Sequence, residues 1–540
     1  MWPPERLILL MLVAALVAGM LLPVYTDEVG WRLQLRAAFD GVDKMYADHC
    51  GPAALPVPPF FMWPVRWWSA FWNGHFPDPF WLRLSGVGYA LGIVGLLWLL
   101  GRRARADLPL PEPGARDRAG TLLLAAPFAL LALGQLPLLL VWSRPEQPLL
   151  LCVLGALLLG WPGGGRARLR IAAIVALATI ALSYHMKGVV LAPLFLLLIG
   201  HIAWRRRDWI GGAAGLLPLA AMAGLAAAYW VGRSRCPGDP VVARMYERLS
   251  DVSELTGSRG IDGIVAALNN NLGLGAYFAS AAPVRITMSA WLEQDRIAPG
   301  LENFAGLLAV MLGGLFLVGV ALALLQGARA GGRGAIADPR WTAALLIVAL
   351  LFGWAAIQPG KNIYEAPFVF AMLAAAWLLA FSVSGMSARV AAMARGIGWQ
   401  LVLLVAAGLA LIGATYGGSL VAAARDSGYL ARQPYSVAVF GYGDEVPRIR
   451  AAAARCGIGP AGTNHALLID DVTYFAFMQD RLPQHWLGVT GQWRDRAKDP
   501  IAYLAGRKSD GAILGCRYLT PEMRAQAIPT GEYCCMPAFR

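Results

Sequence analysis

Long apolar runs separated by short polar segments fill most of the chain. An α-helix needs about 20 consecutive apolar residues to cross a bilayer, and eleven runs approach that length. They predict membrane-spanning helices at approximately 7–24, 84–101, 120–141, 148–162, 169–183, 188–204, 210–231, 303–326, 341–357, 366–384 and 399–421. We therefore expect a multi-span α-helical membrane protein with about 11 transmembrane helices, formed by residues 1–421.

The first run, Leu7 to Val24, could also be the apolar part of a cleaved signal peptide. No cleavage site of the A-x-A kind follows it, because the chain continues directly into the segment 23–28, Pro-Val-Tyr-Thr-Asp-Glu. The apolar part of a signal peptide is usually only about 7–15 residues long. We therefore expect this run to be retained as the first span.

Polar residues in the middle of three long apolar stretches mark hairpin turns. The stretch from Arg170 to Arg205 would be about 52 Å long as a single helix, which is far more than a bilayer needs. Its only polar interruption is the segment 183–188. Since both of its ends are basic, we expect both ends on one side of the membrane and a turn on the other. The same reasoning predicts turns at 143–148 and 358–365.

The arginines fix the expected orientation. Alternate loops between the spans are basic, and their arginines are Arg102, Arg103, Arg105, Arg116, Arg118, Arg166, Arg168, Arg170, Arg205, Arg206, Arg207, Arg329, Arg333, Arg340, Arg389 and Arg395. Basic loops remain on the cytoplasmic side, so we expect a cytoplasmic (inner) membrane protein whose N-terminus is inside and whose C-terminus is outside.

Composition agrees with a membrane protein. The chain is 58% hydrophobic and 15% charged, with a mean hydropathy of +0.54, whereas soluble proteins carry about 25% charged residues. The net charge of +13 is explained by the cytoplasmic loops, and we expect no nucleic-acid partner.

Three longer segments fall on the outer side: 25–83, 232–302 and 422–540. The first contains an apolar stripe at helical spacing from Trp31 and an aromatic-rich stretch from Trp63 to Trp72, which predict surface helices. The aromatic stretch could equally be a compact loop packed on the helices.

The tail, 422–540, changes pattern. Short strand-like runs occur at 436–440, 466–469 and 512–514, and helical patterns occur at 445–455 and 521–527. Alternating strands and helices predict a small extracytoplasmic α/β domain. The sequence Gly-Tyr-Gly-Asp-Glu at 441–445 favours a strand-to-helix turn over a phosphate-binding loop, because it lacks G-x-G-x-x-G.

Six of the seven cysteines fall in predicted outer segments: Cys50, Cys236, Cys456, Cys516, Cys534 and Cys535. The seventh, Cys152, lies within a span. Outer cysteines can form disulfides in an oxidising compartment. The connectivity is not fixed by the sequence, although Cys456 and Cys516 are a plausible pair within one domain. No Cys/His spacing indicates zinc.

Charged residues cluster beside the predicted outer ends of the spans. Asp27 and Glu28 directly follow the first span, and the three turns carry Arg144, Glu146, His185, Lys187, Lys361, Tyr364 and Glu365. Charges this close to hydrocarbon are costly unless they are paired or face a wet cavity. Any single one could simply cap a helix or anchor it at the interface. The recurrence of cations on all three turns, opposite two adjacent acids, favours a reaction that needs a base and releases an anion.

These motifs resemble the GT-C class of glycosyltransferases, polytopic enzymes that take a sugar from a polyprenyl-phosphate carrier. Thr-Asp-Glu-Val-Gly at 26–30 is similar to the acidic motif of members such as the protein O-mannosyltransferases and the aminoarabinose transferases. Ser-Arg-Pro-Glu at 143–146, Tyr-His-Met-Lys-Gly at 184–188 and Lys-Asn-Ile-Tyr at 361–364 resemble their Arg-Pro-Glu, His-x-Lys and Lys-x-x-Tyr elements. The resemblance covers the membrane part and depends on the order of these short motifs. The tail matches no domain of the class.

The resemblance implies an inverting glycosyl transfer, which needs one base opposite the leaving group. We expect Asp27 to be the general base toward the acceptor hydroxyl, a role worth roughly 10²–10⁴-fold in rate. Glu28 would orient the acceptor or share a metal.

The remaining residues would serve the donor. We expect Arg144, His185, Lys187 and Lys361 to bind the leaving phosphate, and Tyr364 to donate a further hydrogen bond. Glu146 and Glu365 are acceptor-side or supporting residues.

The expected partners are a polyprenyl-phosphate-linked sugar, membrane lipids, and a glycan, lipid or protein acceptor. No cofactor is certain; a divalent metal would suit the carboxylates, but they do not require one.

Other functions remain as alternatives. A transporter or flippase of lipid-linked glycans would need charges near mid-membrane and usually internal repeats, and the sequence has neither. A glycan polymerase or ligase typically centres on a large outer loop with arginines late in the chain. A non-catalytic scaffold is the third alternative, because short motifs are weak signals.

Overall fold

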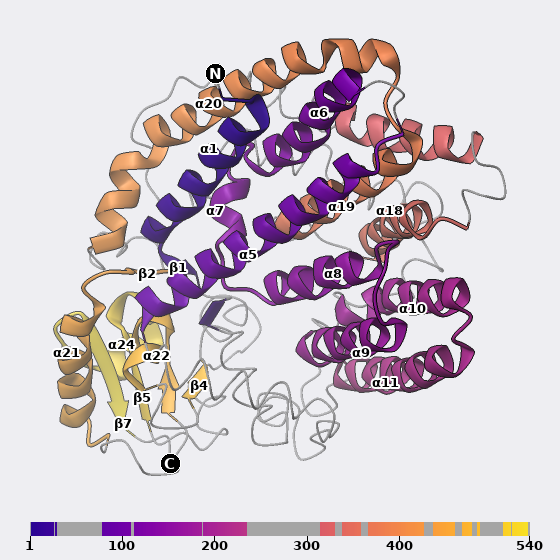
Figure 1. The fold of residues 1–540 in the computed structure, drawn as a ribbon. Helices are drawn as coiled ribbons and strands as arrows, with labels where there is room; N and C mark the ends of the chain where they lie inside the picture. The colour runs from indigo at the N-terminus through magenta and orange to yellow at the C-terminus, as the bar shows by residue number, and fades with distance from the viewer. Residues whose placement is uncertain are drawn as a thin grey trace, which may run out of the picture.

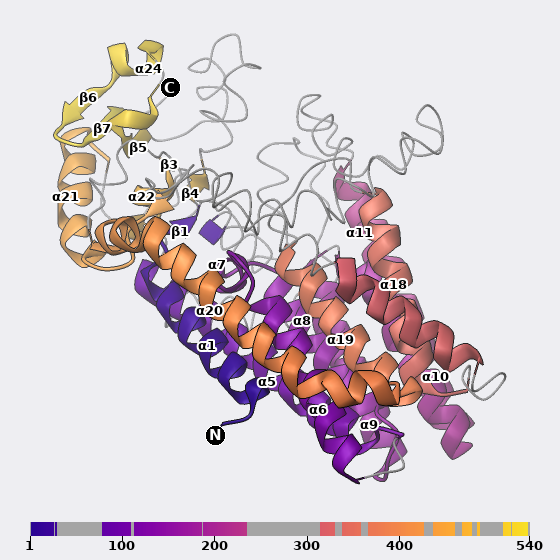
Figure 2. The ribbon, with the colours of Figure 1, turned by 90° about the horizontal axis from the view of Figure 1, so that it is seen from above.

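The computed structural model describes residues 2–25, 28–29, 78–109, 113–185, 187–234, 314–329, 337–357, 366–425, 436–458, 467–477, 483–485, 511–519 and 521–537. Within these ranges the chain forms a group of long helices and, at one end of them, a unit built on a β-sheet (Figure 1). The N-terminus lies at the end of the helices away from the sheet (Figure 2).

The helices are, in order, α1 (Pro4–Ala18), α5 (Pro79–Ala106), α6 (Pro113–Leu131), α7 (Leu136–Leu140), α8 (Glu146–Gly160), α9 (Ala167–Tyr184), α10 (Lys187–Arg206), α11 (Trp209–Ser234), the helix Gly314–Arg329, α18 (Pro339–Ile357), α19 (Ala366–Ser384) and α20 (Ala388–Arg425). Seven of the described helices are long and apolar enough to cross a membrane, and three further apolar ones are shorter. Each predicted span overlaps a described helix, and the total of 11 stays a prediction.

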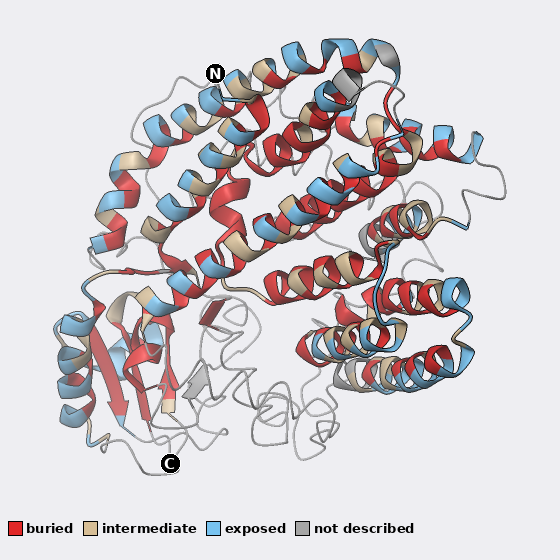
Figure 3. Cartoon of the chain, viewed as in Figure 1, coloured by how far each residue is buried: buried red, intermediate tan, exposed pale blue. Residues whose placement is uncertain are grey.

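The helix α19 is the centre of the bundle. It packs against α5, α6, α8 and α18. Of the residues in its most apolar stretch, 89% are buried. Helices at the periphery of the bundle are less buried, and the residues that face outward are exposed (Figure 3). Many of these exposed residues are apolar. Ile210, Leu217 and Leu403 are 78%, 70% and 69% exposed. Apolar surface of this kind is stable against lipid but not against water, so the chain is a membrane protein.

One expected span is not a single helix. The run 120–141 is divided, since α6 ends at Leu131 and α7 begins at Leu136. Between them Gly134 has a φ of 50°, a left-handed conformation that a helix cannot continue through. The short α7 then carries the chain toward the turn at 143–145, which belongs to the candidate site.

The C-terminal unit is a five-stranded sheet of order β4-β3-β5-β7-β6. Its strands are β3 (Leu467–Ile469), β4 (Pro483–His485), β5 (Gly511–Gly515), β6 (Ile528–Thr530) and β7 (Tyr533–Pro537). The first three pair in parallel and the last two join antiparallel.

Helices cover the sheet: α21 (Tyr442–Arg455) and α22 (Asp471–Phe477) share a core with Ile513 and Cys535, and α24 (Pro521–Gln526) and the 3₁₀-helix η5 (Cys516–Tyr518) pack with Leu514 and Cys534.

The sheet unit is joined to the helices through a shared core. The short strand β1 (Val24–Tyr25) follows α1 and pairs with β2 (Ser436–Val437) at the start of the tail. Val24, Val29 and Leu82 are fully buried in the same cluster as α21 and α22. The described residues of the acidic motif, Glu28 and Val29, therefore lie where the two parts of the chain meet.

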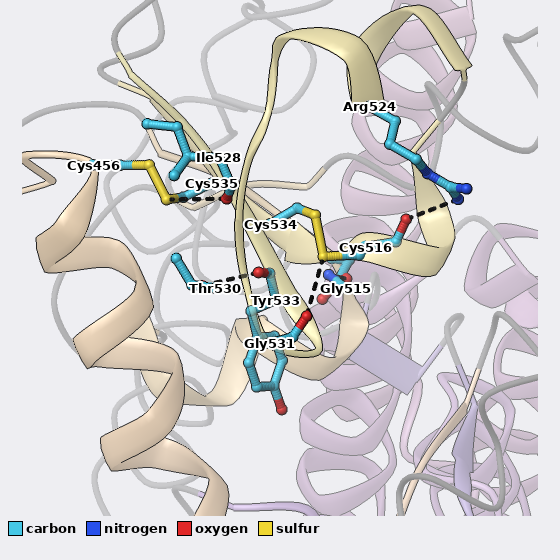
Figure 4. Close-up of a disulfide and its surroundings, with 11 residues drawn as sticks. Cys456, Gly515, Cys516, Arg524, Ile528, Thr530, Gly531, Tyr533, Cys534 and Cys535 are labelled. Carbon is cyan, nitrogen blue, oxygen red and sulfur yellow. Dashed lines mark hydrogen bonds between the residues drawn. A yellow bond between two sulfur atoms is a disulfide. The ribbon is translucent and has the colours of Figure 1, made fainter.

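Two disulfides hold the sheet unit together, and the pair expected from the sequence is wrong. Cys456 bonds to Cys535, and Cys516 bonds to Cys534 (Figure 4). The physical reason is the alternation of side chains along a strand. The neighbours Cys534 and Cys535 on β7 face opposite sides of the sheet, so each reaches a different partner. Cys152 is buried and unbonded, and Cys50 and Cys236 lie outside the described residues.

A buried carboxylate links a helix of this unit to its sheet. Asp470 accepts hydrogen bonds from the backbone N–H groups of Thr473, at 2.8 Å, and of Gly515, at 2.6 Å. Burial raises the pKa of Asp470, and these hydrogen bonds act against the rise. The interaction fixes the start of α22 against the end of β5.

We expect the two disulfides to contribute unequally to stability. Cys456 and Cys535 are 79 residues apart, whereas Cys516 and Cys534 are 18 apart. A longer closed loop removes more entropy from the unfolded chain, so losing the first disulfide should cost about 1 kcal/mol more than losing the second. The Cys456→Ser/Cys535→Ser and Cys516→Ser/Cys534→Ser variants are compared by the temperature at which protease cuts the sheet unit. Equal temperatures would contradict the expected order.

Candidate active site

Glu28 is fully buried, and both oxygens of its carboxylate accept hydrogen bonds. Its Oε2 atom accepts hydrogen bonds from the backbone N–H of Tyr25, at 2.8 Å, and from the Arg83 guanidinium, at 2.7 Å. Its Oε1 atom accepts one from the backbone N–H of Ser143, at 2.7 Å. One carboxylate thus joins the end of the first span, the start of α5 and the turn after α7.

Arg83 is the partner that makes this burial stable. Its side chain is 0% exposed, and it also donates to the carbonyl oxygens of Leu22, Pro23 and Val141 at 2.9, 2.6 and 2.9 Å. An unpaired buried charge would cost several kcal/mol; here the charge is neutralised by Glu28 and the guanidinium donors are used. Arg83 is a site residue that the sequence motifs miss; its signal is its position directly before a predicted span.

A glycine permits the close approach on which the pair depends. A Cβ atom at Gly86 would lie 1.9 Å from the carbonyl oxygen of Val141, so only glycine lets α5 touch the chain there. Gln147 then donates to the carbonyl oxygen of Gly86 at 3.0 Å. The backbone leading into the turn at 143–145 is thereby fixed on α5.

Four charged or ionisable residues form a group that we call the tip cluster: Arg144 in this turn, Glu146 at the start of α8, His185 after α9 and Lys187 at the start of α10. Arg144 Nε donates to Glu146 Oε2 at 3.2 Å. Lys187 Nζ forms a salt bridge with Glu146 Oε1, although the two residues begin different helices. Glu146 and Lys187 are each 3% exposed, so this charged contact is largely shielded from water.

The hairpin between α9 and α10 brings Lys187 to this position. A Cβ atom at Gly188 would lie 2.1 Å from the carbonyl oxygen of Ala181, so glycine lets the two helices meet tightly. His185 Nδ1 accepts a hydrogen bond from the backbone N–H of Lys187 at 3.2 Å, so His185 is held at the start of α10 beside Lys187.

The start of α19 lies against the same cluster. Lys187 Nζ is 5.9 Å from the ring centroid of Phe368, a distance at which a cation is attracted to the ring face. The helix begins at Ala366, directly after the third predicted turn. Phe368 was not expected as a contact, because an aromatic residue in an apolar run carries no distinguishing signal.

The structure brings together five of the nine predicted site residues: Glu28, Arg144, Glu146, His185 and Lys187. The Glu28–Ser143 hydrogen bond joins the acidic motif to the residue next to Arg144, across 115 positions of sequence. The other four, Asp27, Lys361, Tyr364 and Glu365, lie outside the described residues.

The described charges leave an excess of cations. Three cationic side chains, those of Arg83, Arg144 and Lys187, form salt bridges with only two carboxylates, those of Glu28 and Glu146. Such an arrangement can bind an anion and stabilise negative charge that develops on it. Among the described residues, no group of three or more His, Cys, Asp or Glu side chains could hold a metal ion.

The predicted basic loops meet at the other end of the helices. Arg103 donates to the carbonyl oxygen of Leu158 at 2.6 Å, and Arg340 contacts Asp107 at 2.8 Å. Glu146 and Gly160, the two ends of α8, are separated by about 21 Å of helix. The described turns and basic loops therefore alternate between the two ends of the bundle, as the apolar pattern predicts.

No model of a known protein family and no curated protein matches the chain. The solved structures that are similar to it include these two. The archaeal oligosaccharyltransferase AglB from Archaeoglobus fulgidus, in complex with an inhibitory peptide and a dolichol-phosphate, has a TM-score of 0.40 and 13% identity, over 96% of this chain and 70% of AglB. ArnT from Cupriavidus metallidurans, bound to undecaprenyl phosphate, has a TM-score of 0.34 and 14% identity, over 99% of this chain and 97% of ArnT.

Both neighbours are solved with a polyprenyl phosphate, which is the donor carrier of the class that the sequence motifs resemble. At these TM-scores the neighbours transfer no activity and no residue role to this chain.

Proposed function

We propose that the protein is an inverting glycosyltransferase that moves a sugar from a polyprenyl-phosphate donor to an acceptor hydroxyl at the extracytoplasmic membrane face. The observation that carries the proposal is the hydrogen bond from the Ser143 N–H to Glu28 Oε1. It joins the motif that would supply the base to the turn that would supply the cations. Such a reaction needs these two groups within reach of one donor molecule.

Asp27 is the proposed general base. It directly precedes Glu28 in the chain, and the buried carboxylate of Glu28 accepts hydrogen bonds from three donors. Asp27 takes the proton of the acceptor hydroxyl, the oxygen forms a bond to the anomeric carbon, and the bond from that carbon to the phosphate oxygen breaks. The polyprenyl phosphate leaves as an anion, so the reaction needs cations on that side rather than a general acid.

Arg144 and Lys187 are the proposed phosphate-binding cations of the described part, together with His185. Glu146 lies between the two cations and holds both side chains in place. A donor phosphate would share them with Glu146, and its developing charge would strengthen these contacts during the reaction. Lys361 and Tyr364 are proposed to add to this group, with Glu365 supporting them, because α19 begins next to Lys187.

Glu28 is proposed as a positioning residue. Both of its oxygens are already hydrogen-bonded and its side chain is fully buried, so we assign it neither the acceptor nor a metal. Its function is to hold the backbone beside Asp27 at the junction between the membrane helices and the sheet unit. The acceptor, which is a glycan, a lipid or a protein, would approach at this junction.

A transfer assay with purified protein tests the proposal. Polyprenyl-phosphate donors carrying different radiolabelled sugars are offered with lipid, glycan and protein fractions of the cell envelope. We expect the label to move from the polyprenyl phosphate to one acceptor class. No transfer from any polyprenyl-phosphate sugar, by protein that is folded and monodisperse, would overturn it.

Replacing Lys187 with Met should weaken the apparent donor affinity. Loss of one charge-assisted hydrogen bond to a phosphate corresponds to about 10–100-fold in KM for the donor. The measurement is a donor titration at saturating acceptor, and we expect a smaller change in kcat than in KM.

A double variant separates this role from simple pairing. If Lys187 only neutralises Glu146, then adding Glu146→Gln to Lys187→Met should restore the donor KM. If Lys187 binds the phosphate, the donor KM stays high in the double variant. Full restoration would therefore count against the phosphate role.

A further inference from the structure

A second charged feature lies at the opposite end of the helices from the tip cluster. A cavity of about 220 Å³ is lined there by Gly160, Pro162, Gly163, Arg170, His201, Ile202, Arg205, Arg206 and Pro339. We call it the arginine cavity. It is formed where α8 ends, α9 begins, α10 ends and α18 begins, and these helices lie side by side (Figure 1).

The three arginines come from two helices and are fixed mainly by backbone carbonyls. Arg170 donates to the carbonyl oxygens of Leu159 and Trp161, both at 2.6 Å. Arg206 donates to that of Gly163 at 2.6 Å, and Arg205 to that of Ala337 at 3.2 Å. Because a guanidinium has five N–H donors, Arg205 and Arg206 retain donors beyond these bonds.

The cavity contains a concentration of positive charge. Of the residues that the structure describes, no carboxylate lines it, and the nearby described acids form salt bridges with other arginines. Asp208 accepts from Arg168 at 3.0 Å, and Asp338 accepts from Arg340 at 2.7 Å. Burial acts to raise the pKa of Asp338, but its hydrogen bonds from Arg340 outweigh this and the pKa is lowered.

The mutual repulsion of these arginines indicates a site for an anion. Arg170 and Arg206 both donate to the carbonyl oxygen of Gly163, at 3.4 and 2.6 Å, so the two guanidinium groups lie close together. Like charges brought together in a partly buried cavity cost free energy, and a bound anion removes that cost. His201, which is hydrogen-bonded to Thr342 Oγ1 at 3.0 Å, adds a further polar group to the lining of the cavity.

Exposed apolar residues around the cavity place it at a membrane surface. Trp204 and Trp209 are 69% and 64% exposed, and Leu169 is 67% exposed. Tryptophan is favoured at the level of lipid headgroups, which is where lipid phosphates lie. A volume of about 220 Å³ is large enough for several water-sized groups.

We propose that the arginine cavity binds a phosphate group, carried by an anionic membrane lipid or free in solution. Arg205 and Arg206 donate the charge-assisted hydrogen bonds to the phosphate, and Arg170 adds a further positive charge to the lining of the cavity. Exposed tryptophans beside the cavity favour the lipid source. The site is separate from the tip cluster, because about 27 Å of α10 lies between Lys187 and Arg205.

Native mass spectrometry of the full chain, released from bilayers of phosphatidylglycerol mixed with phosphatidylcholine, tests the proposal. Wild-type protein should retain phosphatidylglycerol, and the Arg205→Gln/Arg206→Gln variant should retain roughly tenfold less. The matched control is Arg389→Gln/Arg395→Gln, which removes two arginines of α20 that do not line the cavity, and it should retain phosphatidylglycerol like the wild type. Inorganic phosphate is titrated separately: if it displaces the lipid at millimolar concentration, the shared phosphate chemistry is confirmed and the free anion is a competing ligand.

Equal lipid retention by the wild type and the Arg205/Arg206 variant would overturn the proposal. An equal loss in the α20 control would do so as well, because it would show a general charge effect. If the double variant cannot be purified, Arg206→Gln alone, whose only described hydrogen bond goes to the loop carbonyl of Gly163, gives the same comparison. Failure here leaves the sugar-transfer assay untouched, since that assay concerns the other end of the helices.

Discussion

Replacing Asp27 with Asn is expected to lower the rate of sugar transfer by about 10²–10⁴-fold, the range that a general base contributes. An amide cannot take the proton of the acceptor hydroxyl, although it has nearly the shape of the carboxyl group. The donor should still bind, because Arg144 and Lys187 are unchanged. The expected result is therefore a large loss in kcat at an almost unaltered donor KM, measured with the radiolabelled donor.

The matched control for this variant is Asp117→Asn. Asp117 is exposed and pairs with Arg105 at the opposite end of the helices, and exposed pairs of this kind contribute little to stability. Its transfer rate should equal that of the wild type. Near-normal transfer by Asp27→Asn, in protein that inserts and purifies normally, would remove the central assignment of the mechanism.

The sequence predicted the helices well because the bilayer imposes a simple rule. A run of about 20 apolar residues has one stable conformation in lipid, so α10, α11 and α19 could be located to within three residues at each end. The alternation of basic loops and charged turns followed from the same rule. The break between α6 and α7 was missed, since Gly134 lies in an apolar run that continues on both sides of it.

The arrangement of the site was only partly predictable. Residue type and order identified Glu28, Arg144 and Lys187, but they did not indicate what each one contacts. Glu28 forms a buried salt bridge with Arg83. This contact depends on the packing of α5 against the turn, which is possible because Gly86 has no side chain. The disulfides are similar: the strand β7 was not predicted, so the opposite directions of Cys534 and Cys535 could not be inferred.

Breaking the Glu28–Arg83 pair should produce the largest loss of stability among these variants. Arg83→Met leaves a buried carboxylate without its charge partner, and Glu28→Gln leaves the guanidinium without its own. Removing one partner of a buried pair costs about 3–5 kcal/mol. The free energy of unfolding in detergent, followed by denaturant titration, should fall by that amount in each single variant. Arg168→Met is the control: its side chain is 74% exposed, and the change should be within about 1 kcal/mol.

The double variant Glu28→Gln/Arg83→Met should lose less than the sum of the two single losses, because neither charge is then left alone. A coupling of about 0.5–3 kcal/mol is usual for residues in direct contact.

Well below the unfolding temperature, Glu28→Gln should lower kcat more than it raises the donor KM, since it disturbs the backbone beside Asp27 and leaves the tip cluster intact. Additive losses would mean that the pair does not act as a unit, and an unchanged kcat in folded Glu28→Gln protein would separate Glu28 from the chemistry altogether.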